Sequence, residues 1–286
     1  MSVDAAHSVD EYLATVRAFR ERWRVPKRDE LWFRAEDASY RDTHLQPGIY
    51  RPRDRGKRKT IRHSLDLEND LYEEFERCAT QLSDVTPGED WEWEWYFLMQ
   101  HHGVPTRLLD WSDGALLALH FAVRDKAIPP LSGSVVHVLY PYHLLKELEQ
   151  HSDRRDAKDR WKQYSKTDPY RLDPDEWERL YLPTDEEDFR NPLLATPQIP
   201  LLWDSPHVSR RVAAQRSRFM IFGSDPFWLA NFAKSKDSKL RSIRIPARSI
   251  NRIRRQLRDA GVVESVVYPD LDGLGRELKQ LWQERR

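Results

Sequence analysis

The sequence predicts an α+β fold. Segments with helical periodicity come first in the chain, whereas β-branched runs dominate its second half, and the two types do not alternate strictly. The 286 residues can bury a sizeable core. The 11 tryptophans argue against disorder, because disordered chains are poor in aromatic residues.

Charge and cysteine content narrow the class of protein. Lys+Arg and Asp+Glu both number 47, so the net charge of zero gives no sign of a polyanionic partner. The single Cys78 excludes an intrachain disulfide and a cysteine-cage zinc site, and it suits a reducing compartment. Residues 1–23 lack the apolar core of a signal peptide, and no run approaches the ~18 apolar residues needed to cross a bilayer. We therefore expect a soluble, cytoplasmic protein without membrane contact.

The first half of the chain is expected to be mostly helical. Its elements are helix 8–23 with Ser8 at its N-cap, strand 31–35, helix 66–82 with a buried stripe of Leu67, Leu71, Phe75 and Cys78, and helix 115–123 begun by Ser112 or Asp113. Residues 91–100 fit a helix or a strand, and periodicity does not decide between them.

The second half is expected to supply most of the sheet. Its elements are strands 132–140, 218–223, 239–246 and 262–269, and helices 249–260 and 274–283, the former closed by Gly261. Residues 141–205 are charged and interrupted by proline, with a helical start at 143–150, and we expect an insertion or a mobile lid there.

The densest polar cluster is LMQHHGVPTRLLDWS, residues 98–112. Gly103 and Pro105 predict a tight turn. His101 and His102 are neighbours that point to different faces of a regular element, so we expect no metal site there. The chain has neither a GxSxG nucleophile motif nor a glycine-rich phosphate loop, and Cys78 has the profile of an inert core thiol.

Two interpretations of this cluster remain open. In the first, Arg107 and Asp110 form a buried ion pair that supports the turn, with Trp111 packed over it. In the second, which we favour, the cluster contacts a ligand in a pocket shared with Arg34; its members would be His101, His102, Thr106, Arg107 and Trp111. Arg34 ends a strand, where a guanidinium can bind phosphate or simply pair with Glu36 at the surface.

Two basic segments are candidates for nucleic-acid binding. Seven Lys and Arg residues lie in 51–62, and seven Arg residues lie in 241–258. In the second segment a buried stripe is expected from Ile250, Ile253 and Leu257, which leaves Arg248, Arg252 and Arg255 on a face that could follow phosphates. A solvated surface is the simpler interpretation of each segment alone.

Several segments together resemble the FRG domain family, which is named for an aromatic-Arg-Gly motif near its start. The matching segments are LWFRAEDASY, LQPGIYR, MQHHGVPTRLLDWSDGALLALHFAV, RRVAAQRSRFMIFG and GVVESVVYPDLDGL. They imply an FRG domain over 31–286, containing the 141–205 insertion and preceded by a helical segment at 1–30. The glycine of the motif is Ala35 here, and its methyl group would narrow a site in which a ligand approaches the backbone closely.

The aromatic-Arg end of the strand at 31–35 also resembles the first signature of arginine-type ADP-ribosyltransferases. That resemblance implies a single ADP-ribosyltransferase-like domain that takes NAD as its substrate. In this family an Arg holds the NAD phosphates, a Ser/Thr motif supports the nicotinamide ribose, and a later Glu activates the reaction. Arg34 matches the first role, TRLLDWS falls where the second is expected, and Glu264 and Gln215 are candidates for the third.

The implied activity is transfer of ADP-ribose to a macromolecule or hydrolysis of NAD, for which Glu36, Asp110 or a histidine could act as general base. Loss of nicotinamide passes through an oxocarbenium-like cation that a nearby carboxylate stabilises. Analogy with prokaryotic transferase toxins suggests a toxin or anti-phage effector. The alternative is a non-catalytic domain that senses a nucleotide or a phage component.

Overall fold

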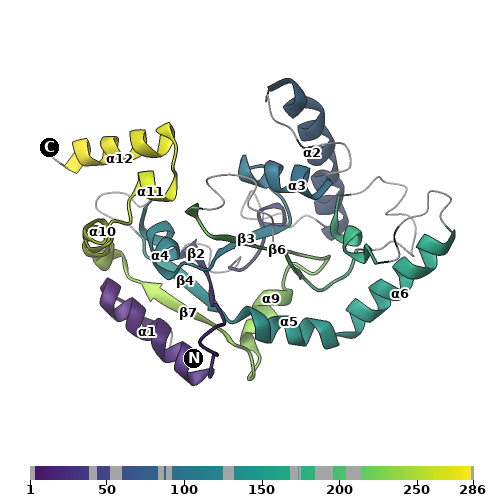
Figure 1. Cartoon of the computed structure of the whole chain (residues 1–286), viewed down its shortest axis with the longest axis horizontal. Helices are drawn as coiled ribbons and strands as arrows, with labels where there is room; N and C mark the ends of the chain where they lie inside the picture. Colours follow the sequence, from purple (N-terminus) through teal and green to yellow (C-terminus); the bar gives the residue numbers. More distant parts are fainter. Residues whose placement is uncertain are drawn as a thin grey trace.

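The structure is a computed structural model that describes residues 4–38, 44–51, 60–82, 87, 92–124, 132–167, 173, 175–183, 196–203 and 214–284. A seven-stranded sheet runs through these residues in the order β1-β7-β4-β2-β3-β6-β5 (Figure 1). The strands are β1 Asp4–Ala5, β2 Trp32–Asp37, β3 Leu108–Ser112, β4 Ser134–Leu139, β5 Leu201–Trp203, β6 Ser217–Ile221 and β7 Leu240–Ile245. Only β1 and β7 pair in parallel. The predicted α+β class is confirmed.

The centre of the sheet is weakly paired. Strand β2 pairs with β4 along its whole length, and β3 pairs with β6 along its whole length. Between β2 and β3, however, the register holds a single pair, Phe33 with Ser112. The two strands therefore separate beyond Phe33, and backbone groups of β3 become available to side chains of β2.

Helices cover the sheet and extend from both of its ends (Figure 1). They are α1 Val9–Arg22, α2 Ile61–Leu82, α3 Glu92–His101, α4 Ala115–Arg124, α5 Pro141–Gln150, α6 Ser152–Thr167, α9 Trp228–Lys234, α10 Ile250–Asp259, α11 Glu264–Val267 and α12 Leu271–Glu284, with 3-10 turns η2 Gly48–Tyr50, η3 Trp177–Tyr181 and η5 Ala247–Ser249. Within the described residues, no helix is both long and apolar enough to span a membrane.

Three of the helix ends predicted from the sequence show the expected capping chemistry. The hydroxyl of Ser8 accepts a hydrogen bond of 3.2 Å from the amide of Glu11, as an N-cap of α1 should. Gly261 has φ +77° just after α10, and Ser112 Oγ accepts from the Gly114 amide just before α4. In the undecided segment 91–100, the described residues 92–100 are helical, and the expected stripe of α10 is buried.

The core consists of three hydrophobic clusters. On one face of the sheet α1, α4 and α10 pack against Phe33, Val136 and Ile243. On the opposite face α5 and α9 pack against residues that include Trp32 and Trp111. The third cluster joins α3, α6 and η3 to β3, β5 and β6.

The outer segments of the chain contribute to this folded body. Strand β1 pairs with β7, and Tyr12, Val16 and Phe19 of α1 are buried, so the segment expected at 1–30 packs on the sheet. Within the expected insertion at 141–205, the described residues include β5 of the sheet and buried side chains of α6 and η3.

Two sequence expectations were wrong. The strand expected at 262–269 is instead the single helical turn α11, because Glu264 and Val267 are both buried there and tertiary packing overrides the β-propensity of the valines. The stripe expected on α2 is only partly buried: Leu71 and Phe75 pack against the core, but the buried residues of that helix are Ser64, Leu65, Glu68 and Ala79. In addition, no element was expected at 108–112, which is strand β3.

Gly103 closes α3 in the left-handed conformation that the tight turn requires, with φ +81°. The amides of Gly103 and Val104 bind the carbonyls of Gln100 and Met99, which is the pattern of a Schellman motif. We expect Gly103→Ala to lower the free energy of unfolding by about 1 kcal/mol, because an L-residue is strained at this φ. Gly275→Ala, in the open middle of α12, should raise it by about 0.5–1 kcal/mol. Urea unfolding of both variants measures the contrast; equal effects would contradict it.

Candidate functional site

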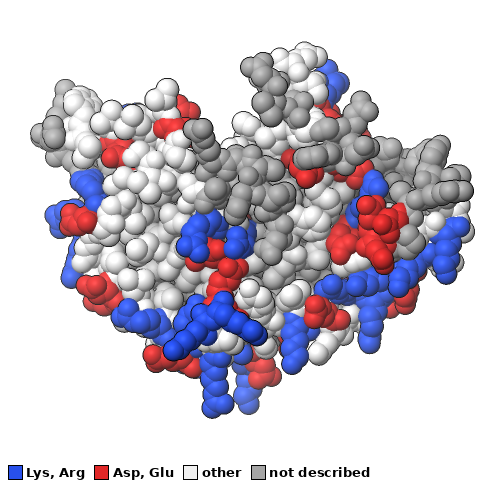
Figure 2. Space-filling view, viewed as in Figure 1, with Lys and Arg blue, Asp and Glu red and all other residues white. Residues whose placement is uncertain are grey.

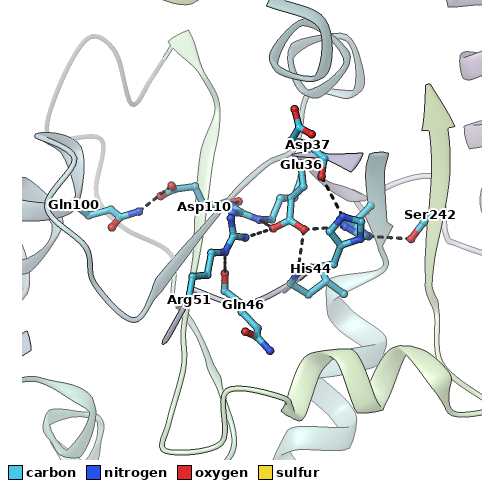
Figure 3. Close-up of polar contacts among 11 residues, drawn as sticks. Glu36, Asp37, His44, Gln46, Arg51, Gln100, Asp110 and Ser242 are labelled. Atoms are coloured by element: carbon cyan, nitrogen blue, oxygen red, sulfur yellow. Dashed lines mark hydrogen bonds and ion pairs between the residues drawn. The ribbon is translucent and has the colours of Figure 1, made fainter. Parts of the chain in front are cut away.

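A buried carboxylate, Glu36, lies at the centre of the polar network shown in Figure 3. Its Oε1 accepts hydrogen bonds from Arg34 Nε at 3.0 Å and Arg51 Nη2 at 2.6 Å. Its Oε2 accepts from the backbone amide of Leu45 at 3.0 Å and lies 3.2 Å from His137 Nε2. All four interactions favour the ionised form of the carboxylate.

The sheet brings this network together from distant parts of the sequence. Arg34 on β2 is opposite His137 on β4, which is opposite Ser242 on β7, so the three side chains form a row on one face. Glu36 is two residues after Arg34 and shares that face. The segment 44–51 then closes over the row, through the Leu45 amide and Arg51.

Two guanidinium groups share the single carboxylate of Glu36. Arg34 Nη1 also donates to the backbone oxygen of Asp110 at 2.7 Å, across the gap between β2 and β3. Arg51 Nε donates to the Gln46 backbone oxygen at 2.9 Å. The side chains of Arg34 and Arg51 stay 17% and 20% exposed, whereas that of Glu36 is 1% exposed. The exposed edge of the network therefore carries positive charge.

The surroundings shift the pKa values of Glu36 and His44. Burial alone would raise the pKa of Glu36, but Arg34, His137 and Arg51 outweigh it and hold that pKa far below its ordinary value. Burial lowers the pKa of His44, and the nearby His137 adds to this effect. Because an ionised carboxylate can only accept, the Nε2 atom of His137 carries a hydrogen.

The exposed Asp110 forms the rim of the network on β3. Its Oδ2 accepts from Gln100 Nε2 at 2.9 Å, and Gln100 Oε1 accepts from the Thr106 hydroxyl at 2.6 Å. Thr106 is fully buried and its hydroxyl also accepts from the amide of Leu108. Thr106 therefore orients Gln100, which in turn holds the carboxylate of Asp110, the residue whose backbone oxygen accepts from Arg34.

Part of the chain that forms this network matches a known protein family. Residues 29–129 match the family model of the FRG domain. The matched FRG segment contains β2, α2, α3, β3 and α4, and with them Arg34, Glu36, Arg51 and Asp110. His137 and Ser242 lie beyond it. A search of curated proteins and a search of solved structures gave no significant match.

Within the FRG segment, Arg107 is a buried side chain that holds parts of the fold together. Its side chain is completely buried, and its ion-pair partner is Glu68 of α2 rather than Asp110. The guanidinium also donates to the backbone oxygens of Tyr181 at 2.6 Å and Phe222 at 3.4 Å, while Tyr96 donates to Glu68. Burial would lower the pKa of Arg107, but Glu68 raises it above its ordinary value. No face of this guanidinium is exposed to a ligand.

The other residues predicted in the 98–112 cluster, Trp111, His102 and His101, make contacts with residues outside the Glu36 network. Trp111 is buried with Trp32 in the core, and its Nε1 has no hydrogen-bond partner among the described residues. The ring of His102 lies 6.2 Å from that of Phe75 on α2, and the His101 ring lies edge-on to His102. Of this cluster, Thr106, Gln100 and Asp110 are the residues that the contacts above connect to Arg34.

Alanine at the glycine position of the FRG motif leaves the network open. Ala35 packs against the core cluster under α4, on the face of β2 opposite to Arg34. Its methyl group is therefore directed into the core and does not narrow the Arg34 side.

The two candidates for the third transferase signature lie beside α4 and α11. Glu264 binds His120 Nε2 at 3.0 Å, Arg124 Nε at 3.3 Å and Arg276 Nε at 3.1 Å. Burial would raise the pKa of Glu264, but His120, Arg124 and Arg276 lower it to about 2. The Gln215 side chain reaches the backbone of Val267 at 3.5 Å. Since α4 covers the face opposite to Arg34, the structure does not bring either residue to the Glu36 network.

The basic residues expected to follow phosphates are exposed on η5 and α10. They are Arg248, Arg252 and Arg255. Arg254 between them is buried and caps α4, donating to the backbone oxygens of Val123 at 2.8 Å and Arg124 at 3.1 Å. Basic and acidic side chains occur side by side along the edges of the face in Figure 2. Nucleic-acid binding stays a prediction.

Sequence reasoning missed several members of the network: His44, Gln46, Arg51, Gln100, His137 and Ser242. Two of them had a visible signal. His137 is a single histidine inside the β-branched run SVVHVLY, and Arg51 ends the landmark LQPGIYR. A polar residue inside a buried strand needs a partner, which is the argument that would have singled out His137.

Proposed function

We propose that this chain binds NAD at the exposed edge of the Glu36 network and either transfers its ADP-ribose to a macromolecule or hydrolyses it. One observation carries the proposal: two partly exposed guanidinium groups share one buried carboxylate where β2 and β3 separate. Two neighbouring guanidinium groups can bind the oxygens of a pyrophosphate through paired hydrogen bonds.

The chemistry assigned to this site is stabilisation of a ribosyl cation. Loss of nicotinamide develops positive charge on the ribose, which a carboxylate nearby would stabilise. Asp110 is exposed, its carboxylate is held by Gln100, and its own backbone oxygen accepts a hydrogen bond from Arg34. Glu36 is buried among its partners, so we assign it the positioning of Arg34 and Arg51 and assign the carboxylate role to Asp110.

Removing Arg34 tests the binding step. Arg34→Ala should abolish NAD binding, measured by isothermal titration calorimetry, with the fold checked by circular dichroism. Arg248→Ala, which removes an exposed guanidinium far along the chain, is the matched control and should bind NAD as the unmodified chain does. Unchanged binding by the Arg34 variant would remove this residue from the site. If the chain does not bind NAD and releases no nicotinamide when nucleic acid and cell lysate are offered as acceptors, the proposed function is wrong.

A second candidate is a nucleotide-sensing domain without turnover. The observation that favours it is the position of Glu264 and Gln215, which lie beside α4 and α11 rather than at Arg34. It predicts NAD or nucleotide binding without nicotinamide release. For either function, the setting we propose by analogy is a toxin or an anti-phage effector.

A further inference from the structure

Glu36 shares its surroundings with two histidines that the proposed function does not use. Glu36, His44 and His137 each offer one ligand atom, and these three atoms lie within 4.8 Å of one another. They come from β2, from the segment that closes over it, and from β4. Glu36 and His137 are buried and His44 is half-buried, so the cluster differs from an exposed group of acidic side chains.

Each histidine is oriented by a hydrogen bond on one of its ring nitrogens. His44 Nε2 lies 3.2 Å from the backbone oxygen of Asp37, and His137 Nδ1 lies 2.9 Å from the hydroxyl of Ser242 (Figure 3). Histidines that bind metals usually donate their second ring N–H to a carbonyl or another oxygen in this way. The arrangement leaves Nδ1 of His44 and Nε2 of His137 for a shared ion.

We propose that Glu36, His44 and His137 bind a divalent first-row transition metal ion such as Zn²⁺. Glu36 would use Oε2, which already lies 3.2 Å from His137 Nε2, and the ion would replace the hydrogen between these two atoms. A tetrahedral zinc with bonds of ~2.1 Å needs ligand atoms ~3.4 Å apart, so a pair separated by the full 4.8 Å would have to close by about 1.4 Å. Three protein ligands leave a fourth position for water or an anion.

The positive charges of Arg34 and Arg51 act against the binding of a metal cation at this site. Arg34 and Arg51 both bind Oε1, so they leave Oε2 to the metal but repel its charge. This repulsion should weaken the affinity for the bare cation. It should also favour an anion such as phosphate in the fourth position, because the anion would face a metal and two guanidinium groups together. The metal proposal does not depend on NAD binding.

Metal binding by the full chain provides the test. After dialysis against a chelator, the protein should bind one Zn²⁺ per chain in a calorimetric titration without nucleotide. One equivalent of Co²⁺ should give the visible absorption of a four-coordinate site. His44→Gln and His137→Gln should each lower the Zn²⁺ affinity at least 10–100-fold, the range lost on removing even an outer-shell partner.

His143→Gln is the matched control, because the His143 ring is half-buried and also binds a backbone oxygen, that of Asp237 at 3.1 Å. It should leave Zn²⁺ binding unchanged. The proposal is overturned if the chain binds neither Zn²⁺ nor Co²⁺, or if His44→Gln binds as tightly as His143→Gln. Thermal unfolding without metal checks that each variant folds. If His137→Gln does not fold, the half-buried His44 decides the question alone.

Discussion

Glu68→Ala is expected to lower the free energy of unfolding by about 3–5 kcal/mol, the cost of leaving a buried charge without its partner. Glu68 and Arg107 form an ion pair in which both side chains are essentially inaccessible to water. The Arg107 guanidinium would remain buried, with neutral backbone oxygens as its remaining acceptors. Urea unfolding monitored by tryptophan fluorescence measures the effect.

The same helix offers a matched control. Glu74 also pairs with an arginine, Arg77, but these two side chains are 62% and 66% exposed. Glu74→Ala should therefore leave the urea midpoint nearly unchanged, because exposed pairs contribute little.

A double variant separates the cost of an orphaned charge from the worth of the pair. Replacing both partners, as Glu68→Leu with Arg107→Met, should recover much of the loss, because apolar residues of similar volume need no partner. Equal effects of the Glu68 and Glu74 variants would contradict the assignment of Arg107 as a buried structural group.

This pair also shows where sequence reasoning stopped. The periodicity of 66–82 correctly predicted a helix, since spacing and capping act over a few residues. It put Leu67, Leu71, Phe75 and Cys78 on the buried stripe, whereas the structure buries Glu68. A carboxylate can be buried there because Arg107 lies against it, and that partner is 39 residues away with no local pattern to announce it.

In the candidate site too, residues within local motifs were predicted from the sequence, whereas residues brought in from distant strands were not. Arg34 and Asp110 were predicted from motifs in one stretch of chain each, and the structure connects them through a hydrogen bond across the separated strands. His137 and Ser242 joined them because cross-strand pairing makes β4 and β7 neighbours of β2. That strand order depends on the packing of the whole chain, and the sequence pattern of one strand does not contain it.

Acid should remove the stabilisation that Glu264 provides. The pKa of Glu264 is lowered from 4.5 to about 2 by His120, Arg124 and Arg276, against the effect of burial. A depressed folded-state pKa contributes stability that is fully present above the unfolded value and is lost as pH falls through the folded value. The window is therefore from pH ~4.5 down to ~2, and the contribution at neutral pH is about 2–3 kcal/mol.

Glu264→Gln should lose this contribution and with it the corresponding pH dependence. The difference in unfolding free energy between the unmodified chain and the variant should be about 2–3 kcal/mol above pH ~5 and should shrink toward zero near pH ~2. Urea unfolding at several pH values measures it. Glu149→Gln, at an exposed position of α5, should show no such gap at any pH. The outcome that would contradict this prediction is a difference in unfolding free energy for Glu264→Gln that stays constant with pH. It would mean that the packing of the Glu264 side chain, and not its negative charge, stabilises the fold.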